Sequence, residues 1–370
     1  MIPQTNPKAT YLAHKAAIDA AVARVLESGW YILGQEVTRF EQEFADAMQA
    51  RWAIGVANGT DALELALRAI GIAHDDGVIT VSHTAVATAS AIARLGALPL
   101  FVDIEPSSYA MDPASLKAAL ASTAGRVAKA VVVVHLYGQP ANMSALLELA
   151  KIHGLPVIED CAQAHGATIA GRPVGTFGDL GCFSFYPTKN LGALGDGGAV
   201  IGTDPELAER IRMLREYGWR KRYISESVGF NSRLDEMQAA ILRAKLPFLA
   251  GENKRRREIA ARYGTLLAGA PLQLPQLIPD TEPVFHQYVV NTARRDELGA
   301  SLREAGVATL VHYPAAVHQQ QAFADPAMQP VPLPCTEAVI PCILSLPMYP
   351  ELRSEQIDET GHAILRCLAS

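Results

Sequence analysis

The chain has 370 residues, of which 49% are hydrophobic and 19% are charged, and its formal net charge is −6. This length predicts a large domain plus a smaller one, and the composition is typical of a globular protein. The acidic balance argues against general nucleic-acid binding, although a local cluster of donors could still bind a small anion. The five cysteines are scattered and form no C-x-x-C pair, which argues against a disulfide framework or a structural zinc site.

The N-terminal segment and the length of the apolar runs predict the cellular compartment. The segment from Met1 to Thr10 is polar and lacks the apolar core of a signal peptide. Apolar runs such as Ala130 to Val134 are too short to span a bilayer. We therefore expect a cytoplasmic protein that does not associate with membranes.

In chain order, apolar residues at helical spacing first predict an amphipathic helix over residues 14–28. A break at Gly29 to Gly34 follows, and then a second helix over 36–48. Short apolar runs typical of buried strands come next, at 52–56, 78–81, 99–102, 131–135, 156–159, 181–185 and 198–201. Many of these runs are separated by predicted helices, at 61–70, 113–120, 143–153 and 205–215.

Apolar strands that alternate with helices predict an α/β fold whose mostly parallel sheet is covered on both faces. Ligands of such sheets bind outside the carboxyl ends of the strands. The pattern changes after Leu246, so we place a boundary near residue 250, between a large domain (1–250) and a small one (251–370). The basic run from Lys254 to Arg257 is interpreted as a solvated helix face, with phosphate contact as the alternative.

Polar residues follow three of the predicted strands. One strand leads into Glu159 and Asp160, with Gln163 shortly after. A second carries Ser184 and leads into Lys189 and a glycine-rich stretch. A third ends at the turn Asn58-Gly59-Thr60, just before a helix. We expect all three segments to lie at one edge of the sheet.

These residue types suit pyridoxal 5'-phosphate (PLP). This cofactor needs a lysine amine for a Schiff base and a carboxylate that keeps its ring nitrogen protonated. Its phosphate needs a cradle, which a helix N-terminus such as the one predicted after Asn58 supplies. Lys189, Asp160 and Ser184 complete the set, the last as a further phosphate donor.

Each of these features also has an ordinary structural explanation. A lysine after a strand is usually a surface lysine, an aspartate there is often a helix cap, and Asn-Gly-Thr is a common turn. The prediction therefore depends on their conjunction and order. Asp160, Cys161 and His165 mix metal-ligand types, but a strand that leads into a helix would point them apart, so we expect no metal site.

With these residues in view, the sequence resembles the PLP-dependent sugar aminotransferases of the DegT/DnrJ/StrS type over nearly its whole length. The segment around Lys189 is highly specific by itself. The matching segments are Ser28–Gly34, Asn58–Leu63, Val102–Pro106, Val134–Gln139, Glu159–Ala167, Phe183–Ala199, Gly229–Ala240, His312–His318 and Ser345–Pro350.

The resemblance implies the type I aminotransferase fold, PLP as cofactor and a homodimer with shared active sites. Lys189 would form the Schiff base, Asp160 would pair with the pyridinium nitrogen and Gln163 would lie near the ring hydroxyl. The implied phosphate ligands are Gly59, Thr60 and Ser184, with Asn231 of the partner subunit. The implied residues on the sugar side are Tyr186, His312, Tyr313 and His318.

Two positions depart from the family pattern. Family members commonly carry an aromatic residue that stacks on the PLP ring, where this chain has Ala85 in the segment His83–Thr88. The usual Gly-Glu-Gly-Gly reads Gly195-Asp196-Gly197-Gly198 here, a milder change. The first departure predicts a wider cleft or another cover for that face of the ring.

The activity that the resemblance implies is amination of a dTDP-linked 3-keto-6-deoxy sugar, with glutamate as the donor. Amination at carbon 4 of a 4-keto nucleotide sugar is the alternative. One branch of the family has histidine at the lysine position and dehydrates its sugar, so Lys189 favours amination. A PLP-binding sensor without catalysis is a further alternative.

Overall fold

The computed structural model describes residues 1–369. Its centre is a seven-stranded sheet in the order β1-β9-β8-β5-β4-β2-β3, in which only β9 runs against the other strands. The strands are β1 (Trp52–Val56), β2 (Gly77–Val81), β3 (Leu98–Val102), β4 (Ala128–Val134), β5 (Val157–Asp160), β8 (Leu180–Ser184) and β9 (Gly198–Gly202). The predicted mostly parallel sheet is thus confirmed.

Helices cover both faces of this sheet because neighbouring strand residues point to opposite sides. On β2, Val78 packs with α4 (Gly59–Ala69), α5 (Val86–Ala93) and α8 (Pro205–Leu214). The next residue, Ile79, packs on the other side with α6 (Pro113–Ala121) and α7 (Met143–Ile152). Farther along that side, α3 (Gln35–Ala47) and α9 (Glu236–Lys245) pack on Phe183 and Ile201.

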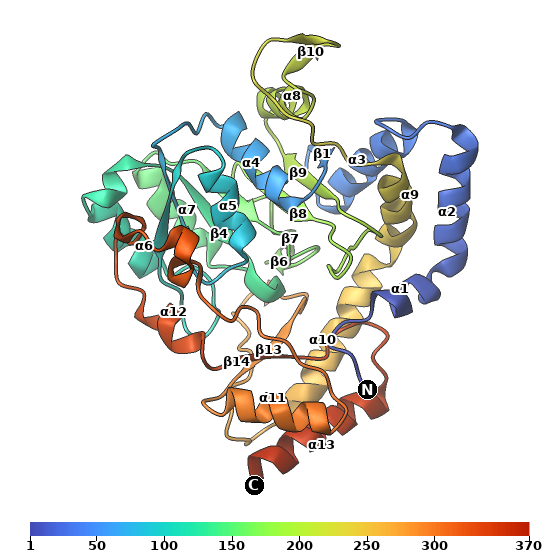
Figure 1. Cartoon of the computed structure of the whole chain (residues 1–370), viewed down its shortest axis with the longest axis vertical. Coiled ribbons are helices and arrows are strands. Elements are labelled where there is room, and N and C mark those ends of the chain that lie inside the picture. Colours follow the sequence, from blue (N-terminus) through green and yellow to red (C-terminus); the bar gives the residue numbers. More distant parts are fainter. Residues whose placement is uncertain (370) are drawn as a thin grey trace.

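The C-terminal third of the chain forms a smaller α+β unit at the bottom of Figure 1. The strands β13 (Tyr288–Asn291) and β14 (Ile343–Leu346) pair antiparallel and share a core with Ile2. Helices α10 (Leu249–Leu266), α11 (Arg295–Glu304) and α13 (Ser354–Ala369) complete this core, and the short α12 (Pro334–Val339) lies nearer the large sheet. The long α10 leads from the large sheet unit into the small one.

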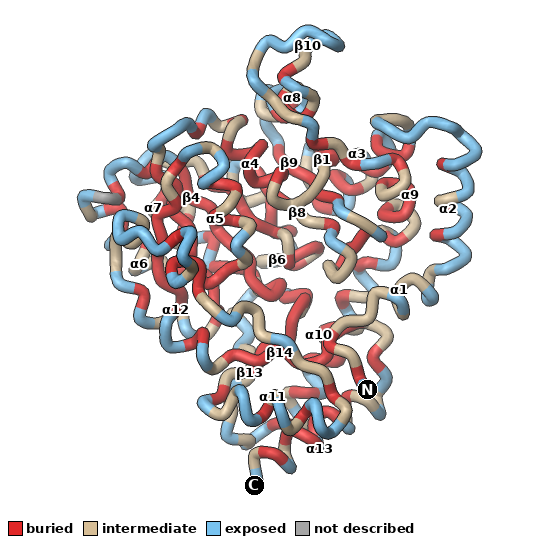
Figure 2. The backbone as a smooth tube through the Cα atoms, in the orientation of Figure 1, coloured by how far each residue is buried: buried red, intermediate tan, exposed pale blue. Residues whose placement is uncertain are grey.

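Two segments lie outside the sheet layers. Helices α1 (Pro7–Ala13) and α2 (Lys15–Ser28) run along one side of the molecule, where α2 packs on α9. The hairpin of β10 (Trp219–Lys221) and β11 (Ile224–Ser225) projects from the top, and most of its backbone is exposed (Figure 2). A small three-stranded sheet is formed by β6 (Thr168–Ile169), β7 (Arg172–Pro173) and β12 (Thr281–Glu282).

The predicted elements agree with the structure except in a few places. Helices α1, α5 and α9 were missed, the helices after α10 were given no bounds, and α4 begins at Gly59, slightly before the predicted start. The basic run on α10 is not wholly solvated, because Arg256 is buried and donates to the carbonyl oxygens of Phe285 and Met348. Within residues 1–369, no helix combines the length and apolarity needed to cross a membrane.

Candidate active site

A cavity of about 480 Å³ lies at the carboxyl ends of the parallel strands. The end of β5 brings Asp160 to it, the end of β8 brings Ser184, and the start of α4 brings Gly59 and Thr60. The lining residues are Asn58, Gly59, Thr60, Leu63, Thr84, Ala85, Ala87, Arg94, Val134, His135, Asp160, Ala162, Gln163, Ser184, Tyr186, Lys189 and Asp196. The three segments singled out in the sequence therefore meet.

The start of α4 forms an anion cradle. The Asn58 side chain caps the helix by accepting a hydrogen bond from the Asp61 amide at 2.8 Å. The backbone packs so tightly against β8 that a Cβ atom added to Gly59 would lie 2.6 Å from the Cβ of Ser184. The first-turn amide groups of a helix have no partner within it and attract negative charge. This geometry suits a phosphate bound among Gly59, Thr60 and Ser184.

Asp160 is buried beside the cavity and has two hydrogen-bond donors. The Thr88 hydroxyl donates to Oδ2 at 2.8 Å, and the Ala162 amide donates to Oδ1 at 3.1 Å. Burial raises the pKa of this carboxyl, although both hydrogen bonds and the charge of Lys189 oppose the shift. A cationic group in the cavity would stabilise the ionised form.

Lys189 follows β8 in a turn in which its amide donates to the Tyr186 carbonyl at 2.8 Å. Burial lowers the pKa of its amine to about 8, although the carboxylate of Asp160 pulls the other way. An amine with this pKa is partly uncharged near neutral pH, and only the uncharged form is a nucleophile. The structure therefore brings an activated amine and a buried carboxylate to one cavity.

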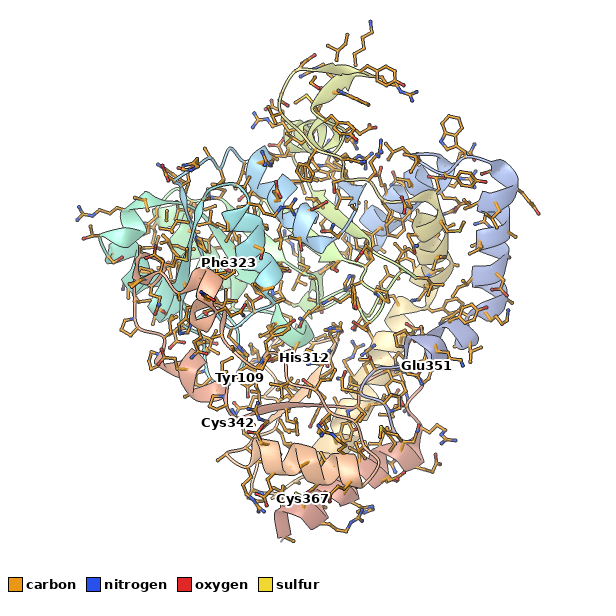
Figure 3. All side chains as sticks on the ribbon, viewed as in Figure 1. Tyr109, His312, Phe323, Cys342, Glu351 and Cys367 are labelled. Carbon is orange, nitrogen blue, oxygen red and sulfur yellow. The ribbon has the colours of Figure 1, made fainter. Side chains whose placement is uncertain are left out.

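Gln163 links the cavity to the small unit. Its Oε1 accepts from the Tyr137 amide at 2.7 Å, and its Nε2 donates to the Tyr313 hydroxyl at 3.2 Å. His312, beside Tyr313, lies where the two units meet (Figure 3). Burial and the charge of Lys189 lower the pKa of His312 to about 4, so this ring is neutral. Tyr186 lines the cavity with an exposed ring.

Four predicted residues do not line this cavity: His312 and Tyr313, which Gln163 connects to it, and His318 and Asn231. His318 is buried elsewhere, with its Nδ1 2.7 Å from the Ser82 hydroxyl. Asn231 is exposed and bridges to Glu216 at the base of the projecting hairpin. Their predicted roles stay predictions, and that of Asn231 concerns a partner subunit.

The structure adds two residues at the site to which the sequence gave no role. Thr88 donates to Asp160, and His135 lies beside the cavity. Both stand in segments quoted for the resemblance or its departures, but nothing in their spacing indicated these contacts. His135 also approaches Glu159 and Cys161 closely enough to suggest a metal cluster.

Hydrogen bonding accounts for that cluster. The Glu159 carboxylate accepts from His135 and from the backbone amides of Gly175, Phe177 and Gly178. His135 Nδ1 accepts from the Ala141 amide, so its proton lies on Nε2 and faces Glu159. Burial raises the pKa of the Cys161 thiol well above its usual value. The donor atoms that a metal ion would need are thus already engaged or protonated.

Ala85, at the position of the expected aromatic residue, contributes only a methyl group to the cavity wall. It lies at the start of α5 and is only partly buried. Among the described residues that line the cavity, the aromatic rings are those of His135 and Tyr186.

A sequence model of the DegT/DnrJ/EryC1/StrS aminotransferase family matches residues 13–365. The chain belongs to this family. Its members are PLP-dependent, so this aminotransferase uses PLP, and the cradle, carboxylate and amine described above fit that cofactor.

Individual relatives match over almost their whole length. The aminotransferase is 48% identical to a dTDP-3-amino-3,4,6-trideoxy-alpha-D-glucose transaminase of Streptomyces venezuelae, over 96% of this chain and 93% of the relative. It is 44% identical to a UDP-N-acetyl-3-dehydro-alpha-D-glucosamine 3-aminotransferase of Acidithiobacillus ferrooxidans, over 99% and 98%. The crystal structure of S. venezuelae DesV with a ketimine intermediate superposes with a TM-score of 0.96 at 47% identity, covering 100% of this chain and 99% of the other.

Proposed function

We propose that this aminotransferase converts a dTDP-linked 3-keto-6-deoxy sugar to the 3-amino sugar, with glutamate as the amino donor. The observation that carries the proposal is the meeting of Lys189, Asp160 and the start of α4 in one cavity. When bound there, PLP supplies an electron-withdrawing ring that stabilises charge developing on the donor carbon.

The chain supplies binding and proton transfer. Lys189 holds the cofactor through its amine and then moves a proton between the donor and the cofactor as base and acid. Asp160 keeps the ring nitrogen protonated, and Gln163 hydrogen-bonds the ring hydroxyl. Gly59, Thr60 and Ser184 bind the phosphate, with Asn231 of the partner subunit. Amination of the keto sugar follows by the same steps in reverse.

The substrate assignment is supported by the printed names of the relatives. The S. venezuelae and A. ferrooxidans enzymes are both named for amino transfer at carbon 3, but one name carries dTDP and the other UDP. We assign Tyr186, His312, Tyr313 and His318 to the sugar side. Amination at carbon 4, sugar dehydration and a non-catalytic sensor are the alternatives, and lysine at position 189 disfavours dehydration.

We also propose a cytoplasmic homodimer made of chains with two domains, 1–250 and 251–370. A reducing compartment is supported by Cys161, Cys182, Cys335 and Cys342, which form no disulfide. A dimer is supported by the exposed apolar side chains of Trp30, Tyr31 and Ile32 in the loop after α2.

The test starts from the absorption band that the cofactor gives when bound to Lys189. Glutamate should convert this band to that of the aminated cofactor, and only a 3-keto dTDP sugar should restore it efficiently. Restoration by a 4-keto or a UDP sugar instead would move the assignment to that substrate. Failure of glutamate to change the band would contradict the aminotransferase proposal as stated and favour the sensor.

Lys189→Ala tests the role of the lysine. The variant should fold and still bind PLP in the phosphate cradle, but it should lose the Lys189 band and turnover, because no other amine holds the cofactor. The control is Lys151→Ala on the exposed side of α7, which should behave as wild type. Turnover by the Lys189 variant would rule out the assigned role.

A further inference from the structure

A chain of buried polar side chains runs from the N-terminal segment to the residue beside Lys189. Its inner end is Asn190, whose Nδ2 donates to Asn253 Oδ1 at 2.8 Å and to the Val284 carbonyl at 3.0 Å. Asn190 Oδ1 lies 3.2 Å from His286 Nδ1. Because the Val284 carbonyl can only accept, Asn190 must present its oxygen to His286, and His286 Nδ1 must carry a proton.

The other ring nitrogen of His286 faces a donor. Gln287 Nε2 lies 3.4 Å from His286 Nε2, and Gln287 Oε1 accepts from Gln4 Nε2. Gln4 also donates to the Leu346 carbonyl at 3.3 Å, which fixes the orientation of its amide. Every proton therefore points the same way, from Gln4 through Gln287 to His286 and Asn190. A protonated Nε2 on His286 would face another donor and break this order.

Charges around His286 also favour its neutral form. Burial lowers its pKa well below the usual value, and the charges of Lys189 and Arg256 lower it further. We therefore expect the ring to stay neutral at neutral and alkaline pH. One nitrogen donates and the other accepts, as the chain requires.

Both ends of this chain are anchored to different parts of the fold. At the outer end, the Ile2 amide donates to the Gly306 carbonyl and the Met348 amide donates to the Gln4 carbonyl, so residues 2–4 belong to the small unit. At the inner end, Asn253 of α10 donates to the His165 carbonyl at 2.7 Å. The chain thus joins both units at the turn that holds Lys189.

We propose that Gln4, Gln287 and a neutral, Nδ1-protonated His286 form a hydrogen-bond chain that positions Lys189 through Asn190. These are positioning residues, since Gln4 and Gln287 lie outside the cavity wall. The chain keeps the Lys189 turn packed, which maintains the burial that lowers the pKa of the lysine. This inference rests on the proposed role of Lys189, but the state of the His286 ring does not.

The ring state can be measured directly. The PLP-loaded protein labelled with ¹⁵N-histidine should give one signal pair with a protonated Nδ1 and a bare Nε2, unchanged from about pH 6 to 9 and absent in His286→Gln. A proton on Nε2, or a titration within that range, would overturn the inference. The control is His362→Gln, which removes an exposed histidine on α13.

The positioning role is tested on the cofactor-free protein. Acetylation of Lys189, followed by mass spectrometry across pH, reports the pKa of its amine. Gln4→Leu should admit water behind the turn and raise that pKa by about half a unit, which slows labelling near neutral pH about threefold. The control Gln273→Leu changes an exposed glutamine of the same unit and should have no effect.

Gln4→Asn serves as a second variant, because its side chain is too short to reach Gln287 but keeps the polar group. An unchanged labelling profile in both folded Gln4 variants would overturn the positioning role. A Lys189→Ala enzyme that still turns over would instead refute the proposed function and leave the ring measurement intact.

Discussion

At the residue scale, the site depends on how each ionisable group is surrounded. Burial raises the pKa of Asp160 and lowers that of Lys189, so both charged forms are disfavoured in the free cavity. A protonated ring nitrogen beside Asp160 would relieve this cost. Ala85 leaves one cavity wall without a stacking ring, a difference that is already visible from the sequence.

The neighbours of Thr88 determine where its hydroxyl proton points. It donates to the Asp160 carboxylate, so the Thr84 hydroxyl, 3.1 Å away, must donate to it in turn. This pair of hydroxyls stabilises the ionised form of Asp160, since hydrogen bonds to a carboxylate lower its pKa. Removing the Thr88 hydroxyl would keep the shape of the site but would lose this stabilisation of the ionised carboxylate.

Thr88→Val should therefore raise the pKa of Asp160 further and weaken protonation of the cofactor ring. A hydrogen bond to a charged group contributes about 1.5–3 kcal/mol, so kcat should fall at least about tenfold. The ionised carboxylate is present above its pKa, so the acid limb of the kcat profile should move to higher pH. Thr88→Ser should restore both values, and an unchanged acid limb in the valine variant would refute this role.

At the scale of elements, contacts between distant segments can cap a helix whose own sequence supplies no capping side chain. Helix α3 follows Gly34, which has no side chain to cap it. Glu236, at the start of α9, accepts from the amides of Gly34, Glu36 and Val37 instead. The local sequence of α3 cannot reveal a cap that comes from α9, so this contact could not be predicted.

Helix α4 depends in the same way on the close approach of β8. In Gly59→Ala, the new Cβ would lie 2.6 Å from the Ser184 Cβ and push the first turn of α4 away. We expect a loss of about 1–3 kcal/mol in stability and weaker PLP binding, measured by denaturant unfolding and cofactor titration. Gly264→Ala is the matched control, because nothing lies within 4 Å of a Cβ added there in α10. This control should be neutral or stabilising by up to about 1 kcal/mol, and equal behaviour of both variants would contradict the cradle.

At the scale of the whole molecule, the proposed shared site makes the dimer part of the chemistry. The exposed Asn231 lies at the base of the projecting hairpin and outside the cavity of its own chain. A residue in this position can bind the cofactor phosphate only if the cavity of another subunit lies close to it. Activity then depends on pairs of chains.

Mixed dimers test this arrangement. Lys189→Ala and Asn231→Ala should each be inactive or nearly so when expressed alone. If the sites are shared, a mixed dimer carries both defects in one site and none in the other, so coexpression should recover about a quarter of wild-type activity for random pairing. Self-contained sites would recover none, and light scattering of each sample verifies that dimers are present.

The sequence alone predicted the strands of the large sheet, most helices before residue 250 and the cofactor, because these follow from local hydrophobic patterns and from a long, specific match around Lys189. The residues assigned to bind the cofactor stay predictions. The sequence did not predict α1, α5 or α9. Only the tertiary structure decided that Thr88 donates a hydrogen bond to Asp160, that backbone amides donate to Glu159, and that Arg256 is buried. Each of these depends on segments far apart in the chain, whose contacts arise from packing and leave no local pattern. The same holds for Gln4 and His286, which only the folded chain connects to the turn beside Lys189.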